Sequence, residues 1–141
     1  MRACISADRC HNRHMLLYAA MMAAQEDIAM AHATAMEEEL LSLSPSFWDE
    51  MADFLDAFIP MRWHVMVRFG RWDQILAASS SGSSSSSSSV YYDPSEHVVA
   101  HTTMAYARGI AFGVKGLLPE AREELAKVDA VLADPIASDG N

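Results

Sequence analysis

The stretch that decides the fold reads Tyr106-Ala-Arg-Gly-Ile-Ala-Phe-Gly-Val-Lys-Gly-Leu-Leu-Pro-Glu-Ala-Arg-Glu-Glu-Leu-Ala-Lys-Val128. Gly109 and Ala121 are small enough to let two antiparallel helices approach closely. Gly116 is suited to end the first helix in a left-handed conformation, and Pro119 is suited to the first turn of the second helix. The stretch therefore predicts two helices over residues 97–115 and 119–132, joined by a tight turn.

Two earlier segments of the chain show the same kind of helix end. Ala24, Gly70 and Gly116 each follow an apolar helical pattern, and they are separated by the same interval of 46 residues. This interval predicts an internal repeat of helical hairpins. The apolar spacing predicts helices over residues 10–24, 26–41, 47–58 and 61–69, and a short return helix from Trp72. Pro60 is expected to kink or restart the chain between the third and the fourth helix.

Three short segments give the chain a resemblance to a known family: His11-Asn-Arg-His14, Arg68-Phe-Gly-Arg-Trp72 and Tyr106-Ala-Arg-Gly109. With the spacing of small and apolar residues after Gly109, they resemble tetratricopeptide repeat proteins, and more narrowly divergent bacterial-type members. The resemblance implies an all-α superhelix of about three antiparallel helix-turn-helix hairpins. It also implies a concave groove, lined by the first helix of each hairpin, that binds peptides or other proteins. It implies no catalytic residue and no cofactor, so we expect a binding scaffold and not an enzyme.

The interval of 46 residues exceeds the length of a standard tetratricopeptide repeat, which is about 34 residues. We attribute the excess to a connection over residues 44–51 in one unit and to a serine-rich tract in the next. Serine fills residues 79–89 except for Gly82, and such a tract cannot bury apolar surface. It predicts a flexible linker inside a single domain that spans residues 1–141.

Charge and composition exclude several partners. The formal net charge is -9 and the pI is about 4.9, which argues against a nucleic-acid surface or an anionic membrane surface. The longest uncharged apolar run, residues 15–24, has about half of the roughly 20 residues that a membrane-spanning helix requires. Cys4 and Cys10 form neither a CxxC motif nor two pairs, which favours a reducing compartment. We therefore expect a cytoplasmic protein that binds neither nucleic acid nor membranes, and the sequence leaves its oligomeric state open.

Counting back from the three helix ends predicts which polar residues face the groove. The candidate ligand- or peptide-binding residues are His11, His14, Tyr18, His64, Arg68 and Tyr106. Such a set suits a carboxylate or a peptide, because arginine can donate two parallel hydrogen bonds and aromatic side chains give contacts of low entropic cost. Ordinary, partly exposed polar residues on an alanine-rich scaffold explain the same pattern equally well.

A small-molecule or metal site formed by His11, His14 and His64 is the alternative hypothesis for the histidines. His11 and His14 lie three residues apart on one helical face, with Cys10 beside them, and His64 could approach from the next repeat. The chain contains no HExxH motif and no acidic residue next to this pair, so packing and surface roles are favoured and no metal ligand is assigned. Two smaller predictions are that Glu37-Glu-Glu39 forms a solvated face, and that Arg108 pairs with a carboxylate such as Glu120 or Glu123.

Overall fold

The computed structural model describes residues 2–80 and 97–133 of the chain, and within these ranges all regular secondary structure is helical. The helices are α1 (Arg2–Met22), α2 (Glu26–Leu41), α3 (Pro45–Asp56), α4 (Met61–Arg68), α5 (Trp72–Ser80), α6 (Val98–Val114) and α7 (Leu118–Leu132). The predicted all-α fold is confirmed, while the tetratricopeptide-like superhelix stays a prediction. Residues 79 and 80 of the predicted linker belong to α5, and its remainder, residues 81–89, lies outside the described ranges.

Three turns of the same geometry join α1 to α2, α4 to α5 and α6 to α7. The residue at the predicted helix end has a positive φ in each of them: 55° at Ala24, 68° at Gly70 and 77° at Gly116. The amide of the next residue then donates a hydrogen bond to the carbonyl oxygen five residues before it. These bonds are Gln25 to Ala20 (2.9 Å), Arg71 to Met66 (2.8 Å) and Leu117 to Phe112 (2.9 Å). This is the Schellman pattern of a helix C-terminus, and it confirms the three equivalent helix ends.

The predicted helix over residues 47–58 is present as α3, but it begins at Pro45, so most of the segment 44–51 is helical and only its start is a connection. Ser44 is the N-cap of α3, and its side-chain oxygen accepts a hydrogen bond from the amide of Phe47 (3.4 Å). Pro45 occupies the first turn, where its missing N–H costs nothing. The backbone of Met51 departs from helical geometry and kinks the helix (φ -121°, ψ 17°). The sequence Ser-Pro-Ser therefore ends α2 and also starts α3.

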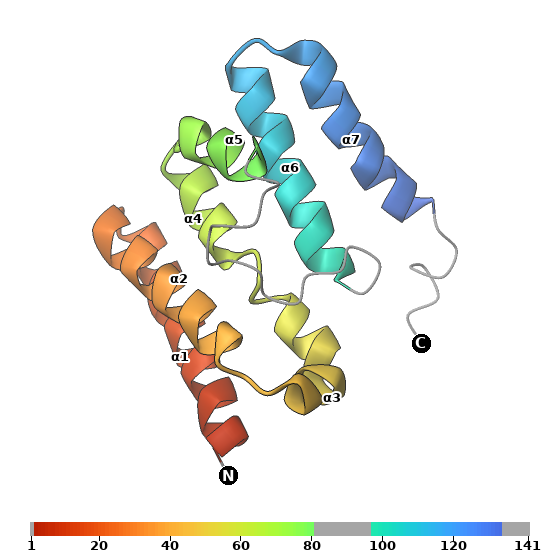
Figure 1. The fold of residues 1–141 in the computed structure, drawn as a ribbon. Helices are drawn as coiled ribbons and strands as arrows, with labels where there is room; N and C mark the ends of the chain where they lie inside the picture. The colour runs from red at the N-terminus through yellow and green to blue at the C-terminus, as the bar shows by residue number, and fades with distance from the viewer. Residues whose placement is uncertain (1, 81–96, 134–141) are drawn as a thin grey trace.

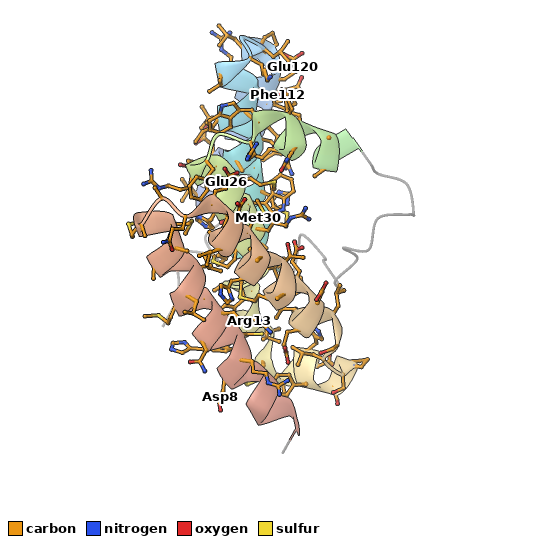
Figure 2. The ribbon with its side chains drawn as sticks, turned by 90° about the vertical axis from the view of Figure 1, so that its left-hand side faces the viewer. Asp8, Arg13, Glu26, Met30, Phe112 and Glu120 are labelled. Carbon is orange, nitrogen blue, oxygen red and sulfur yellow. The ribbon has the colours of Figure 1, made fainter. Side chains whose placement is uncertain are left out.

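Apart from α3, which lies at the lower side in Figure 1, the helices follow one another from the α1–α2 pair at one end of the molecule through α4, α5 and α6 to α7 at the other. One core cluster lies among α1, α2, α3 and α4 and reaches the start of α6. A second and smaller cluster joins α4, α5 and α6. Met30 of α2, which is labelled in Figure 2, packs against both clusters and connects them.

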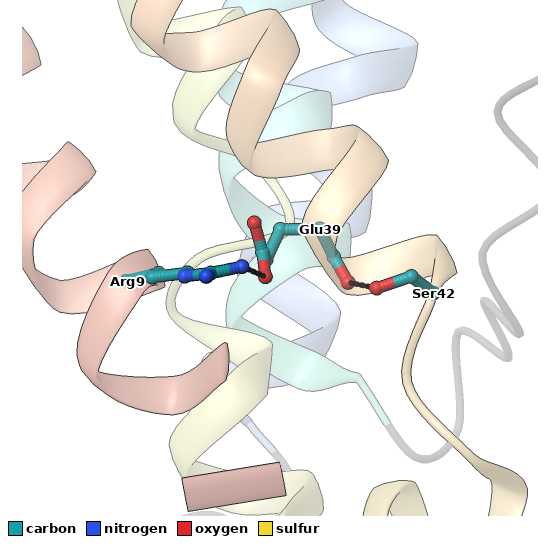
Figure 3. Close-up of polar contacts among 3 residues, drawn as sticks. All are labelled: Arg9, Glu39 and Ser42. Atoms are coloured by element: carbon teal, nitrogen blue, oxygen red, sulfur yellow. Dashed lines mark hydrogen bonds and ion pairs between the residues drawn. The ribbon is translucent and has the colours of Figure 1, made fainter. Parts of the chain in front are cut away.

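Polar contacts between helices lie at the edge of this core. Arg9 of α1 pairs with Glu39 of α2 (Nη1 to Oε1, 3.4 Å), and the hydroxyl of Ser42 donates to the backbone carbonyl oxygen of Glu39 (2.7 Å), as Figure 3 shows. Glu37 pairs in turn with Arg62 of α4 (3.5 Å). The prediction that residues 37–39 form a solvated face is therefore wrong for two of the three carboxylates, because α1 and α4 supply arginines beside them.

Candidate functional site

Five of the six predicted site residues lie on α1 and α4, and we call this set the α1–α4 face (His11, His14, Tyr18, His64 and Arg68). The half-buried ring of His14 is the centre of the set. It makes an edge contact with the ring of Tyr18 (centroids 4.8 Å apart) and a second one with Phe58 (5.3 Å), just before α4. Aromatic packing of this kind holds the imidazole in one orientation.

The two half-buried histidines of this face are close enough to affect each other electrostatically. Burial lowers the pKa of His14, and the nearby His11 lowers it further. Burial also lowers the pKa of His64, with a smaller contribution from His14. Both imidazoles are therefore neutral at pH 7, so that each has one N–H donor and one nitrogen acceptor. His11 itself is exposed on α1.

Arg68 connects the two helices of the face. Its Nε donates a hydrogen bond to the backbone carbonyl oxygen of Met21 near the end of α1 (3.3 Å). The side chain is otherwise exposed, and it forms no ion pair with any described residue. The hydrogen bond at Nε orients the guanidinium and leaves its terminal N–H groups available to an anionic ligand.

Tyr106 is the predicted site residue that the structure places elsewhere. It is half exposed on α6, and it lines an apolar cavity of about 310 Å³ together with Gly109, Ala121 and Leu125. The residues that line this cavity all belong to α6 and α7. Five of the six candidates therefore lie on α1 and α4, and the sixth lies on α6, where it lines a cavity with α7.

The described residues provide no ligand set for the metal-binding alternative. Residues 8–78 and 97–133 contain no group of three histidine, cysteine, aspartate or glutamate side chains that could hold a metal ion. Cys10 is fully buried in the core, and burial, with the nearby Glu39, raises the pKa of its thiol to about 11. A protonated, inaccessible thiol is a poor ligand, because metals bind the thiolate.

A cavity between α2, α4 and α5 contains residues that the sequence did not single out. Its volume is about 480 Å³, and Glu37, Arg62 and Trp63 lie on its wall. Burial raises the pKa of Glu37, although the paired Arg62 opposes this shift. No local pattern could have revealed this site, because Glu37 and Arg62 meet only through the packing of α2 against α4.

Arg108 has a different partner from the ones predicted. Its guanidinium pairs with the buried carboxylate of Glu124 (2.9 Å) and lies 5.9 Å from the ring centroid of Trp63. Lys127 donates a second hydrogen bond to Glu124 (2.7 Å). Burial alone would raise the pKa of Glu124, but these two cations outweigh it and lower the pKa. The predicted kind of pairing is confirmed, while the choice of Glu120 or Glu123 is wrong, because Glu124 is the glutamate that α7 buries against α6.

Comparisons with known proteins add no relative to this picture. No family model, no curated protein and no solved structure matches the chain. Among the described helices, none combines the length and the apolar character that crossing a membrane would need.

Proposed function

We propose that this protein is a tetratricopeptide-like binding scaffold, without catalytic activity, that recognises the free carboxylate of a peptide or protein partner at the α1–α4 face. The single observation that carries the proposal is the state of Arg68. Its guanidinium is oriented by the carbonyl oxygen of Met21, exposed to solvent and free of any ion pair with a described residue. An oriented and unpaired guanidinium is the group that proteins use to bind carboxylates through two parallel hydrogen bonds.

The surroundings of Arg68 fit the same ligand. His64 lies one helical turn before it on α4 and is close enough to His14 of α1 for the pKa of His64 to be affected, and the ring of His14 packs against Tyr18. The neutral imidazoles can donate hydrogen bonds without adding a buried charge, and Tyr18 offers a flat apolar contact beside them. The chain as a whole is strongly acidic, with a net charge of -9. The acidic surface would therefore repel a carboxylate ligand in most places, and the ligand would be attracted mainly to an arginine that has no ion-pair partner.

The scaffold part of the proposal is supported by the repeated turns and by the order of packing. Each turn-linked pair contacts the next one along the chain, since α4 packs on both α1 and α2, and α6 packs on both α4 and α5. This is the nearest-neighbour arrangement of helical repeat proteins. The first helices of the three pairs, α1, α4 and α6, contribute the predicted binding residues.

The experiment that tests this function is selection from a peptide library with free C-termini, followed by affinity measurement with the best peptide. Substitution Arg68→Ala should weaken binding by about 10-fold to 100-fold, the equivalent of one charge-assisted hydrogen-bond pair. Amidation of the peptide C-terminus should weaken it by a similar factor. Fluorescence anisotropy of a labelled peptide gives both dissociation constants.

The matched control is Arg122→Ala, because Arg122 is an exposed arginine on α7, at the opposite end of the molecule. It removes the same charge from the protein and should leave peptide affinity unchanged. Equal losses in the two variants would show that net charge governs binding. Selected peptides that tolerate both Arg68→Ala and amidation would reject the proposed carboxylate site.

A further inference from the structure

The last helix pair exposes an apolar surface at the end of the stack, beside the cavity that Tyr106 lines. We call it the end face, and its residues are Tyr106, Ile110, Leu125, Val128 and Leu132. Tyr106 is 51% exposed, Leu125 57% and Leu132 75%. On α7 these side chains follow the helical spacing of a buried stripe, yet no described helix covers them. An exposed apolar patch next to a preformed cavity is typical of a binding surface.

The internal repeat shows what covers this stripe elsewhere in the molecule. Two intervals of 46 residues before Ala121, Leu125, Val128 and Leu132 lie Ala29, Ala33, Met36 and Leu40 of α2. All four of these α2 residues are completely buried. One interval before Ala121 lies Ile75 of α5, which is also completely buried. The helix α4 packs on α2, and α6 packs on α5. At the equivalent place on the last pair, a helix is missing from the described part of the chain.

The charges beside the stripe indicate what kind of helix fits. On α2, Glu37 lies at the edge of the buried stripe and pairs with Arg62 of the covering helix α4 (3.5 Å). Asp129 holds the same position on α7, two intervals later in the sequence. It is exposed, and it forms no ion pair with a described residue. The end face therefore keeps a carboxylate at the point where the internal equivalent meets an arginine.

We propose that the end face binds an amphipathic α-helix of a protein partner, seated as α4 is seated on α1 and α2, with a lysine or arginine that pairs with Asp129. Helix recognition of this kind uses apolar anchors three and four residues apart, which fill a groove between two helices. The surface is separate from the α1–α4 face, so this inference does not depend on the carboxylate site proposed above.

A second copy of the chain is a less suitable occupant for the end face. If copies stacked end to end, α1 of one copy would take the role that α4 plays inside the molecule. The residue of α1 one interval before Arg62 is Leu16, which is exposed. Leu16 would place an apolar side chain beside Asp129, and the carboxylate would have no ion-pair partner at the contact. This disfavours end-to-end stacking of two copies.

The probe for the test is a fluorescently labelled, end-capped synthetic peptide of residues 57–71, which contains α4 and so carries the apolar stripe and Arg62. We expect it to bind the full-length protein and Leu125→Glu to weaken binding at least tenfold. Leu125 is more than half exposed, so this variant should fold normally, as circular dichroism will verify. Substitution Met22→Glu, at a 70% exposed residue of α1, is the matched control and should leave the affinity unchanged.

Charge reversal adds a second, independent readout. Asp129→Arg should weaken binding of the same peptide, and a peptide with Arg62→Glu should recover binding to that variant while it loses binding to the parent protein. A peptide that fails to bind, or that binds parent and Leu125→Glu alike, would overturn the proposal. A parent protein that is dimeric by light scattering and becomes monomeric in Leu125→Glu would overturn it as well, since the occupant would then be a second copy.

Discussion

At the scale of single residues, Asp56 shows how one side chain connects distant parts of the chain. Its carboxylate is almost fully buried and accepts hydrogen bonds from the backbone amides of Val99 (2.8 Å) and Ala100 (3.0 Å). These amides belong to the first turn of α6, whose own N-cap residue, His97, makes no side-chain cap hydrogen bond. The carboxylate of Asp56 in α3 therefore caps the N-terminus of α6, a role that a serine or aspartate adjacent in sequence commonly has. Its negative charge also interacts favourably with the positive end of the α6 dipole.

We predict that Asp56→Ala lowers the free energy of unfolding by about 2–3 kcal/mol, because a buried N–H group and a partly buried one lose a charged acceptor. Asp56→Asn should cost less, since its amide oxygen can still accept one of the two bonds. Urea denaturation monitored by circular dichroism measures both changes. The control is Asp49→Ala, an exposed aspartate of the same helix, which should change stability by less than about 0.5 kcal/mol. Equal losses at the two positions would contradict the capping role.

The sequence contains no sign of this contact, because Asp56 and Ala100 are 44 residues apart. The choice of Glu124 as the partner of Arg108 was unpredictable for a related reason. Glu120, Glu123 and Glu124 are all within reach in sequence, and only the rotation of α7 on its axis decides which of them faces α6.

At the scale of elements, the three turns differ in the energetic cost of the residue that adopts the left-handed backbone conformation. Gly70 and Gly116 adopt positive φ without a steric penalty, whereas Ala24 adopts φ 55° with a Cβ atom. A non-glycine residue in this region costs roughly 1 kcal/mol relative to glycine. The first turn is therefore the strained member of three otherwise equivalent turns.

We predict that Ala24→Gly raises the free energy of unfolding by up to about 1 kcal/mol and that Gly116→Ala lowers it by a similar amount. An added Cβ at Gly116 would have no neighbour within 4 Å, so the second effect reports the backbone alone. Ala19→Gly, at an exposed position inside α1, is the control and should be destabilising by up to about 1 kcal/mol. Chemical denaturation of the three variants gives the comparison. A loss of stability in Ala24→Gly would show that the turn is not strained.

At the scale of the whole molecule, the packing of one helix pair on the next creates properties that neither pair has alone. His14 belongs to the first pair and His64 to the second, and burial lowers the pKa of both. A neighbouring histidine lowers each pKa further. His14 packs on Phe58, just before α4, and His14 lowers the pKa of His64, so the contact between the two pairs connects the stability of the stack to pH.

The sign of this dependence follows from proton binding. The unfolded state has histidines with pKa near 6.5, and the folded state has His14 and His64 with lower values. The unfolded state therefore binds more protons as pH falls through this range. We predict that protonation of His14 and His64 has no effect on the free energy of unfolding above about pH 6.5. The free energy of unfolding then decreases as pH falls toward the pKa values of the two histidines in the folded state.

Thermal unfolding between pH 7.5 and 5.5 measures this effect. The double variant His14→Gln/His64→Gln should show a smaller decrease in melting temperature over this range than the parent protein. His32→Gln, at a half-buried histidine of α2, serves as the control and should keep the dependence of the parent. A double variant with an unchanged pH dependence would mean that these two histidines do not set it.

The sequence by itself determined the all-α class, the positions of the three left-handed helix ends and most helix boundaries, because these depend on residues within one or two turns of each other. It also placed His11, His14 and Tyr18 on one helix and His64 and Arg68 on another, which are α1 and α4 of the structure. Only the tertiary structure decided that Asp56 of α3 supplies the cap of α6, that Tyr106 lines a cavity between α6 and α7, and that no described helix covers the apolar stripe of α7. These features depend on which helix packs against which, and such contacts join residues far apart in the chain.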